Sequence, residues 1–183
     1  MRHVLRPTPS RMPKAGLAAG MVIAMFATTA WAGDPNGPTG MPKPSSTYRF
    51  VFDLSAVPPG PDDIDPGLRQ VAQLVDTYAA YGVGTGHRKF VVVIHGGKVD
   101  LGLTAAAYGA RNGGQDNANI ALMRSLANRG VRFIVSEPSS PLEKIDRRDV
   151  QPFVEIGPNA NITFLDLETG GYVYTSTKSL ADE

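Results

Sequence analysis

From Tyr48 onward the chain alternates between two patterns of apolar residues, one with the period of a strand and one with the period of a helix. Short segments dense in β-branched and aromatic residues are typical of strands. They predict strands at Tyr48–Leu54, Lys89–His95, Val131–Val135, Phe153–Gly157 and Tyr172–Ser176. The second of these contains an unbroken apolar run, Phe90–Ile94, which favours a parallel strand covered on both faces.

Apolar residues at helical spacing separate these strands. The clearest helix begins at Asp65, an N-cap residue followed by Pro66 at the first helical position, and its apolar face continues to about Ala80. The same patterns predict helices at Asp100–Ala110, at Ile120–Leu126, from Ser140 to the residue before Pro152, and at Asn159–Gly171. The last segment is ambiguous between helix and strand, and a helix is preferred.

The alternation of strand and helix predicts an α/β fold with an open parallel sheet and helices on both of its faces. In such sheets ligands bind beyond the carboxyl ends of the strands. Here those ends carry Asp53, His95, Ser136 and Gly157. We therefore expect any functional site at this edge of the sheet.

The first 32 residues have the pattern of a signal peptide. Four basic residues precede the apolar run Ala15–Ala27, and Ala30-Trp31-Ala32 matches a signal-peptidase site. The alternative is a retained membrane anchor, but the apolar run is short for a transmembrane helix. We expect cleavage and a periplasmic or secreted protein with no membrane association. A flexible tail rich in proline and glycine then covers residues 33–46, and one domain covers residues 47–183.

Charge and cysteine content exclude several classes of function. Removal of residues 1–32 takes away four of the 18 basic residues and none of the 17 acidic ones, which changes the formal net charge from +1 to −3. This balance argues against a nucleic-acid partner. The chain has no cysteine, so thiol catalysis, persulfide transfer, disulfides and cysteine-ligated metals are excluded.

His95 is the first candidate for chemistry. It ends a buried strand and precedes Gly96 and Gly97, so it could act as an acid or base, or bind a small anion together with exposed backbone amides. The alternative is a structural histidine that a neighbouring carboxylate or carbonyl satisfies. Asp53 could orient His95 from the adjacent strand, but we favour a role in capping the following loop.

The remaining candidates carry less chemistry. Ser136 lacks the G-x-S-x-G context of a nucleophile, and we interpret it as a polar strand end. His87 and His95 lie at opposite ends of one strand, too far apart to share a metal ion. We therefore expect no metal and no cofactor, no established catalytic group beyond the weak candidates His95 and Asp53, and ligand contacts from His95, Gly96, Gly97 and Ser136.

Several stretches together resemble exported members of the DsrE/DsrF-like (YchN-like) sulfur-relay family: "YRFVFDLS", "KFVVVIHGG", "DNANIALMRSLANRGVRFIVS", "QPFVEIG" and "LDLETGGYVYTS". The resemblance extends from about Tyr48 to Thr177. It implies a three-layer α/β sandwich and a homo-oligomer, a trimer or hexamer. In many exported relatives a persulfide-carrying cysteine follows the strand that matches "RFIV", whereas this chain has Ser136 there. A hydroxyl does not carry sulfane sulfur, so that chemistry does not transfer.

Three functions remain open. The preferred one is a non-catalytic DsrE-like domain in a sulfur-metabolism-related context, which binds a small ligand or a protein partner near His95 and Ser136. The first alternative is an enzyme that uses His95 with Asp53 for acid/base chemistry, which requires a pocket with the two side chains in contact. The second is a purely structural subunit, whose strand ends would be buried between subunits.

Overall fold

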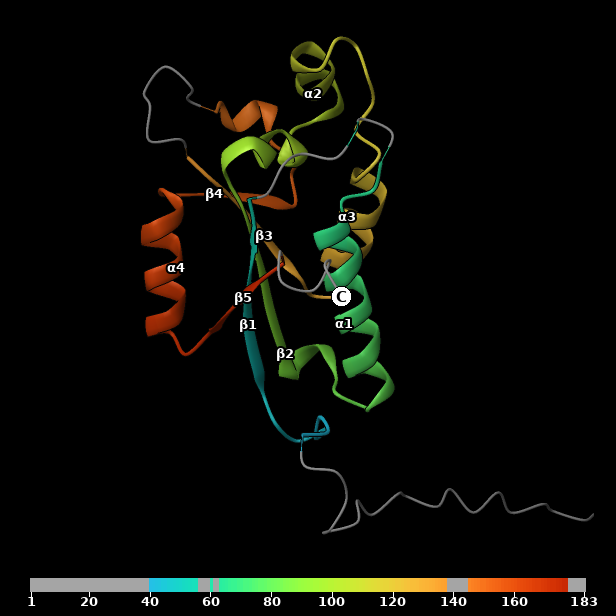
Figure 1. The fold of residues 1–183 in the computed structure, drawn as a ribbon, viewed down its shortest axis with the longest axis vertical. Helices are drawn as coiled ribbons and strands as arrows, with labels where there is room; N and C mark the ends of the chain where they lie inside the picture. The colour runs from blue at the N-terminus through green and yellow to red at the C-terminus, as the bar shows by residue number, and fades with distance from the viewer. Residues whose placement is uncertain (1–39, 56–59, 61–62, 138–144, 178–183) are drawn as a thin grey trace, which may run out of the picture. The chain divides into compact units, whose positions relative to one another are not determined.

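The predicted strands form a single five-stranded sheet in the computed structural model, which describes residues 40–55, 60, 63–137 and 145–177 (Figure 1). The strand order is β4-β3-β2-β1-β5 and every pairing is parallel, which confirms the open parallel sheet. Each predicted strand end lies within one residue of the observed one. The strands are β1 (Tyr48–Leu54), β2 (Arg88–Ile94), β3 (Arg132–Ser136), β4 (Val154–Gly157) and β5 (Val173–Ser176).

Three of the predicted helices have the expected start and type. Helix α1 (Pro66–Ala80) begins at the Asp65 cap, whose Oδ1 accepts from the backbone N–H groups of Gly67 at 2.8 Å and Leu68 at 3.2 Å. The ambiguous segment after β4 is helical, as preferred, and forms α4 (Ala160–Thr169). Helix α3 (Ile120–Asn128) also follows the prediction.

The helix predicted at Asp100–Ala110 is wrong in its first half. A 3₁₀ helix, η2 (Gly96–Gly102), occupies that part, and helix α2 (Ala105–Arg111) starts later. Between them, Leu103 is extended and forms an isolated antiparallel bridge with Val150. This long-range pairing has no signal in the local sequence pattern.

The same pairing limits the helix predicted from Ser140 to Pro152. The start of that helix lies outside the described residues. Residues 145–152 contain a single 3₁₀ turn, η4 (Arg147–Asp149), so the prediction is wrong there. The turn ends because Val150 is extended and paired with Leu103.

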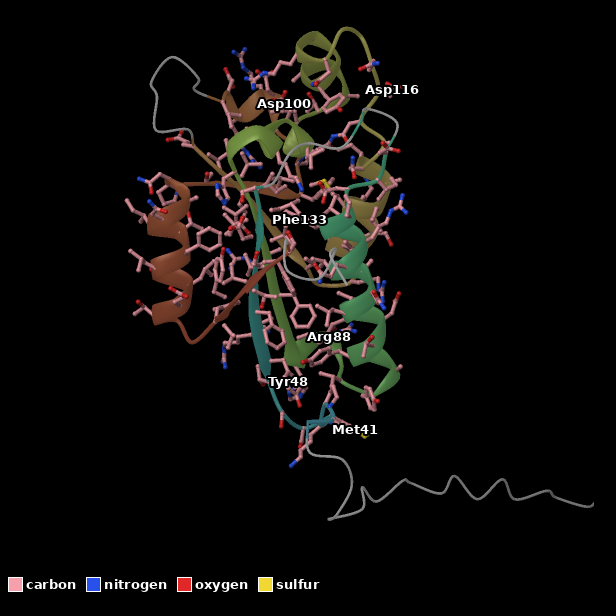
Figure 2. All side chains as sticks on the ribbon, viewed as in Figure 1. Met41, Tyr48, Arg88, Asp100, Asp116 and Phe133 are labelled. Atoms are coloured by element: carbon pink, nitrogen blue, oxygen red, sulfur yellow. The ribbon has the colours of Figure 1, made fainter. Side chains whose placement is uncertain are left out.

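Helices cover the two faces of the sheet unequally. Helices α1 and α3 lie on one face and α4 on the other (Figure 1), as the sandwich prediction requires. Side chains fill the space between the sheet and α1, among them the fully buried Phe133 (Figure 2). On the opposite face, Val91 and Val93 of β2 pack in one cluster with Leu167 of α4. Both faces of β2 are therefore buried, which explains its unbroken apolar run.

The N-terminal expectations are only partly covered by the described residues. The predicted signal peptide and residues 33–39 lie outside them. Residues 40–46 form turns next to β1, where the backbone N–H of Lys43 donates to the hydroxyl of Tyr48 at 2.7 Å. Within the described part of the chain, no helix is long and apolar enough to span a membrane.

Strand register brings the candidate residues together. Leu54 of β1 lies opposite Ile94 of β2, and Ser136 of β3 lies opposite Gly157 of β4. Because Ile94 lies opposite Val135, the following residues His95 and Ser136 occupy neighbouring positions at the same edge. The fold therefore assembles one site from the ends of separate strands.

Candidate functional site

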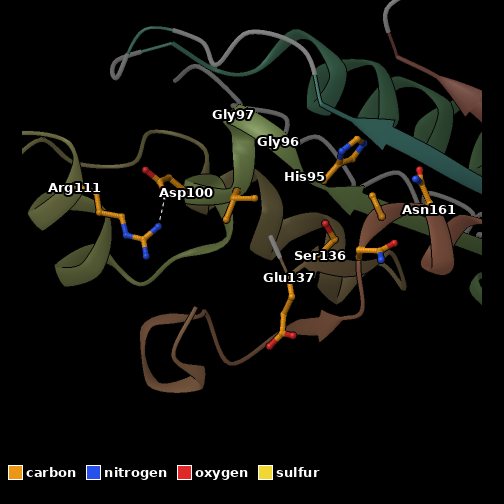
Figure 3. A pocket seen from close by; sticks show the side chains of 11 residues that line it. His95, Gly96, Gly97, Asp100, Arg111, Ser136, Glu137 and Asn161 are labelled. Carbon is orange, nitrogen blue, oxygen red and sulfur yellow. Dashed lines mark hydrogen bonds and ion pairs between the residues drawn. The ribbon is translucent and has the colours of Figure 1, made fainter. Parts of the chain in front are cut away.

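An open cavity of about 790 Å³ lies beyond the carboxyl ends of β2 and β3. Figure 3 shows its lining, which comes from the turn after β2, helix α2, the end of β3 and the first turn of α4. All four residues that we expected to contact a ligand line this cavity: His95, Gly96, Gly97 and Ser136. The sequence missed the contributions of α2 and α4, because the approach of these helices depends on tertiary packing.

His95 is held by Asp53. The imidazole Nε2 lies 2.9 Å from Asp53 Oδ1, and the two side chains are 24% and 14% exposed. The structure therefore contains the pairing across adjacent strands that we had not favoured, and Asp53 also makes a hydrogen bond with Ser55 in the loop that follows β1, where we expected it to act as a cap. With Nε2–H donating to the carboxylate, Nδ1 is the ring nitrogen left for other partners.

Asp53 has a second strong donor that sequence reasoning missed. The hydroxyl of Tyr174, on the edge strand β5, donates to Asp53 Oδ2 at 2.5 Å. Burial alone would raise the pKa of Asp53, but hydrogen bonds from His95, Ser55 and Tyr174 outweigh it and hold that pKa well below its usual range. Burial, the hydrogen bond to Asp53 and its negative charge raise the pKa of Tyr174 to about 12. Asp53 is therefore an anion and Tyr174 a neutral donor at physiological pH.

An aromatic contact completes this arrangement. Phe164 of α4 packs edge-on against the His95 ring at a centroid distance of 5.7 Å, and against Tyr174 at 5.2 Å. The imidazole is thus fixed by a carboxylate on one side and by a phenyl ring on another. The pairing of β5 with β1 brings Tyr174 to this site, since it sets Tyr174 opposite Val51, two residues before Asp53. The pairing partner of β5 is not visible from the pattern.

Ser136 is the last residue of β3, in agreement with its interpretation as a polar strand end. Its side chain lines the cavity although the residue is only 4% exposed. Within the described part of the chain its hydroxyl has no hydrogen-bond partner. Buried hydroxyls in proteins are normally hydrogen-bonded. An unpartnered one at the wall of an open cavity is available to a ligand.

Most of the charge in the lining is already paired. Arg111 Nη1 donates to Asp100 Oδ1 at 2.9 Å, and Asn112 donates to the other oxygen of that carboxylate at 3.3 Å. Glu137 is the remaining carboxylate, and it is exposed (Figure 3). The cavity is therefore polar: Arg111 and Asp100 neutralise each other, and Glu137 adds an exposed carboxylate to the lining.

His87 has no part in this site. It lies at the opposite end of β2, where its Nδ1 is 3.3 Å from the hydroxyl of Thr47, in agreement with the predicted separation of the two histidines. Among the described residues, no group of three or more acidic or histidine side chains is arranged to hold a metal ion.

Comparison with known proteins gives a distant structural neighbour. No family model matches the chain, and no curated protein matches it. One solved structure, a protein of unknown function, MTH1491, from Methanobacterium thermoautotrophicum, aligns at 18% identity and a TM-score of 0.46 over 70% of this chain and 98% of its own. A likeness at this level bears on neither family nor function.

Proposed function

We propose that this protein is an exported, DsrE-like domain that binds a small polar molecule, or a group presented by a partner protein, in the cavity around His95 and Ser136. The observation that carries the proposal is an open cavity lined by a fixed imidazole and by a serine hydroxyl that has no hydrogen-bond partner among the described residues. A sulfur-related role would not include persulfide transfer, because the chain has no cysteine.

A screen of small polar molecules by NMR tests this proposal. With the ¹⁵N-labelled processed protein, we expect saturable shifts of the backbone amides at His95, Gly96, Gly97 and Ser136. The variants His95→Gln and Ser136→Ala should weaken binding by roughly tenfold each, about the loss of one hydrogen bond to a ligand. His87→Gln is the matched control, since it changes the histidine at the other end of β2, and it should bind normally. Shifts scattered away from the cavity would count against the proposal.

A second candidate is acid/base catalysis by His95 with Asp53. The 2.9 Å contact favours it, because a carboxylate on Nε2 fixes the tautomer that leaves Nδ1 as a proton acceptor. Any compound that binds in the NMR screen should be followed over hours with the unmutated protein and with His95→Gln. Conversion that needs His95 would make the protein an enzyme, whereas bound compounds recovered unchanged would leave it a binding protein.

The third possibility is a purely structural subunit. We retain the expectation of a homo-oligomer, a trimer or hexamer, and light scattering of the processed protein measures it directly. An assembly that protects His95 from solvent exchange and binds no compound would favour the structural role over both others.

A further inference from the structure

We propose that the group recognised in this cavity is an anion, a carboxylate, phosphate or sulfate carried by a small organic molecule, and that backbone amides from two walls hold it together with Ser136. This inference rests on the proposed binding function and adds the class of ligand.

The first wall is the start of α4. Asn159 caps this ten-residue helix, with its Oδ1 accepting from Ile162 N–H at 3.1 Å and its backbone oxygen accepting from Thr163 N–H at 3.1 Å. The first two amides of the helix, those of Ala160 and Asn161, have no acceptor among the described residues. Both residues line the cavity, where the positive end of the helix dipole favours an anion.

The second wall is the turn after β2. Gly96 has φ +59°, a conformation that favours glycine, and it starts η2 with Gly97 beside it. Neither N–H group has an acceptor among the described residues, because the first backbone bond of this turn runs from Lys98 N–H to His95 O. Both glycines are exposed and line the same cavity as Ala160 and Asn161.

The side chain of Ser136 is a second indication of a ligand site, independent of the backbone amides in the two walls. Its side chain lies between the two walls in Figure 3 and is directed into the cavity. The residue is only 4% exposed, and its hydroxyl has no partner in the described part of the chain. This hydroxyl lines the same cavity as the four N–H groups, none of which has an acceptor among the described residues, and it can therefore act as a fifth donor. The carboxylate of Asp100 does not compete for these donors, because Arg111 and Asn112 already engage it.

The variant Ser136→Cys turns this geometry into a measurement. The chain has no cysteine, so the introduced thiol is unique, and its thiolate places a negative charge in the cavity, directly beside the proposed anion position. We expect its pKa, measured from the pH dependence of alkylation by mass spectrometry, to fall at least one unit below the ordinary value of about 8.5. Ser125→Cys, on the exposed side of α3, is the reference and should titrate normally. A thiol at position 136 with an ordinary or raised pKa would overturn the inference, because burial without donors raises it.

A titration of the unmutated protein gives the same answer without a substitution. Acetate and acetamide have nearly the same shape and differ in charge. We expect acetate and inorganic phosphate, but not acetamide, to shift the amides of Gly96, Gly97, Ala160 and Asn161 saturably. Equal responses to acetate and acetamide would overturn the anion inference while leaving the binding function standing. A cavity that responds to no compound in the screen would instead remove the binding function itself.

Discussion

At the scale of single residues, Asp53 determines how the site is arranged. One carboxylate oxygen contacts His95 Nε2, the other accepts from Tyr174, and the backbone oxygen accepts from the Thr177 hydroxyl at 2.6 Å. These partners come from the residue after β2, from β5 and from the residue after β5. A single side chain thus fixes the imidazole and joins the edge strand to the site.

The low pKa of Asp53 predicts a defined loss of stability in acid. Its folded pKa lies below the ordinary value near 3.9, so its contribution to stability is complete above that value and is lost as the pH falls toward the folded pKa. We expect Asp53→Asn to flatten the dependence of the unfolding free energy on pH between about 5 and about 2.5. Denaturant unfolding across this pH range measures the slope.

His95 provides the control for that experiment. His95→Gln removes one of the partners that lower the pKa of Asp53, so it should flatten the slope in part. The double variant should have the same slope as Asp53→Asn alone, because both changes act on one titration. A slope in Asp53→Asn equal to that of the unmutated protein would show that another carboxylate dominates acid unfolding.

At the scale of elements, the strands were predictable and the connections were not. The strands and α1 have signals that lie within the element itself, namely the apolar period and the Asp65-Pro66 start. The segments on either side of the Leu103–Val150 bridge were misassigned because their conformation depends on a partner 47 positions away in sequence. Gly102, next to this bridge, shows the same dependence on tertiary packing.

Gly102 is required by the close packing of η2 on β3. A Cβ atom at this position would lie 2.3 Å from Val135 Cγ2, a distance that no packed side chain tolerates. We expect Gly102→Ala to destabilise the fold by about 1–3 kcal/mol, the usual cost of overpacking a core. Gly84→Ala is the matched control, since a Cβ there meets open space and φ is −70°. Urea unfolding measures both, and an equal effect of the two substitutions would contradict this explanation.

At the scale of the whole molecule, a buried ion pair and a neighbouring hydrogen bond link three segments at the carboxyl edge of the sheet: the start of α1, η2 and the residue before α3. Lys98 Nζ in η2 lies 2.5 Å from Asp65 Oδ2 at the start of α1, and the side chains are 4% and 0% exposed. That oxygen makes no aligned hydrogen bond among the described residues, so the ammonium is its partner. Asn119, just before α3, accepts from the backbone N–H of Asp65 at 2.7 Å.

The same edge shows how far the sequence could predict the site. His95, Ser136 and the two glycines were found because the carboxyl ends of parallel strands must gather at one edge. Tyr174 and Phe164 were missed, since nothing local places the last strand beside β1. Lys98 was also missed, because a lysine in a glycine-rich turn is normally solvated, and only the fold shows that it is buried.

The last prediction concerns this ion pair, which links the stability of the fold to the cavity around His95 and Ser136. Lys98→Met leaves the Asp65 carboxylate buried without its counter-charge, so we expect a loss of about 3–5 kcal/mol. The double variant Asp65→Asn, Lys98→Met should lose less, because no unpaired charge remains and the amide oxygen can still cap α1. The pair of Arg129 and Asp76 is the exposed counterpart, and Arg129→Met should cost at most about 1 kcal/mol.

Denaturant unfolding of the single and double variants gives these differences, and a Lys98→Met loss as small as that of Arg129→Met would contradict the role of the pair. The effect should also reach the cavity, since Lys98 directly follows Gly96 and Gly97 on η2. In Lys98→Met, the two glycine amides should therefore lose their response to acetate, while the double variant, whose turn is again free of an unpaired buried charge, should regain part of it.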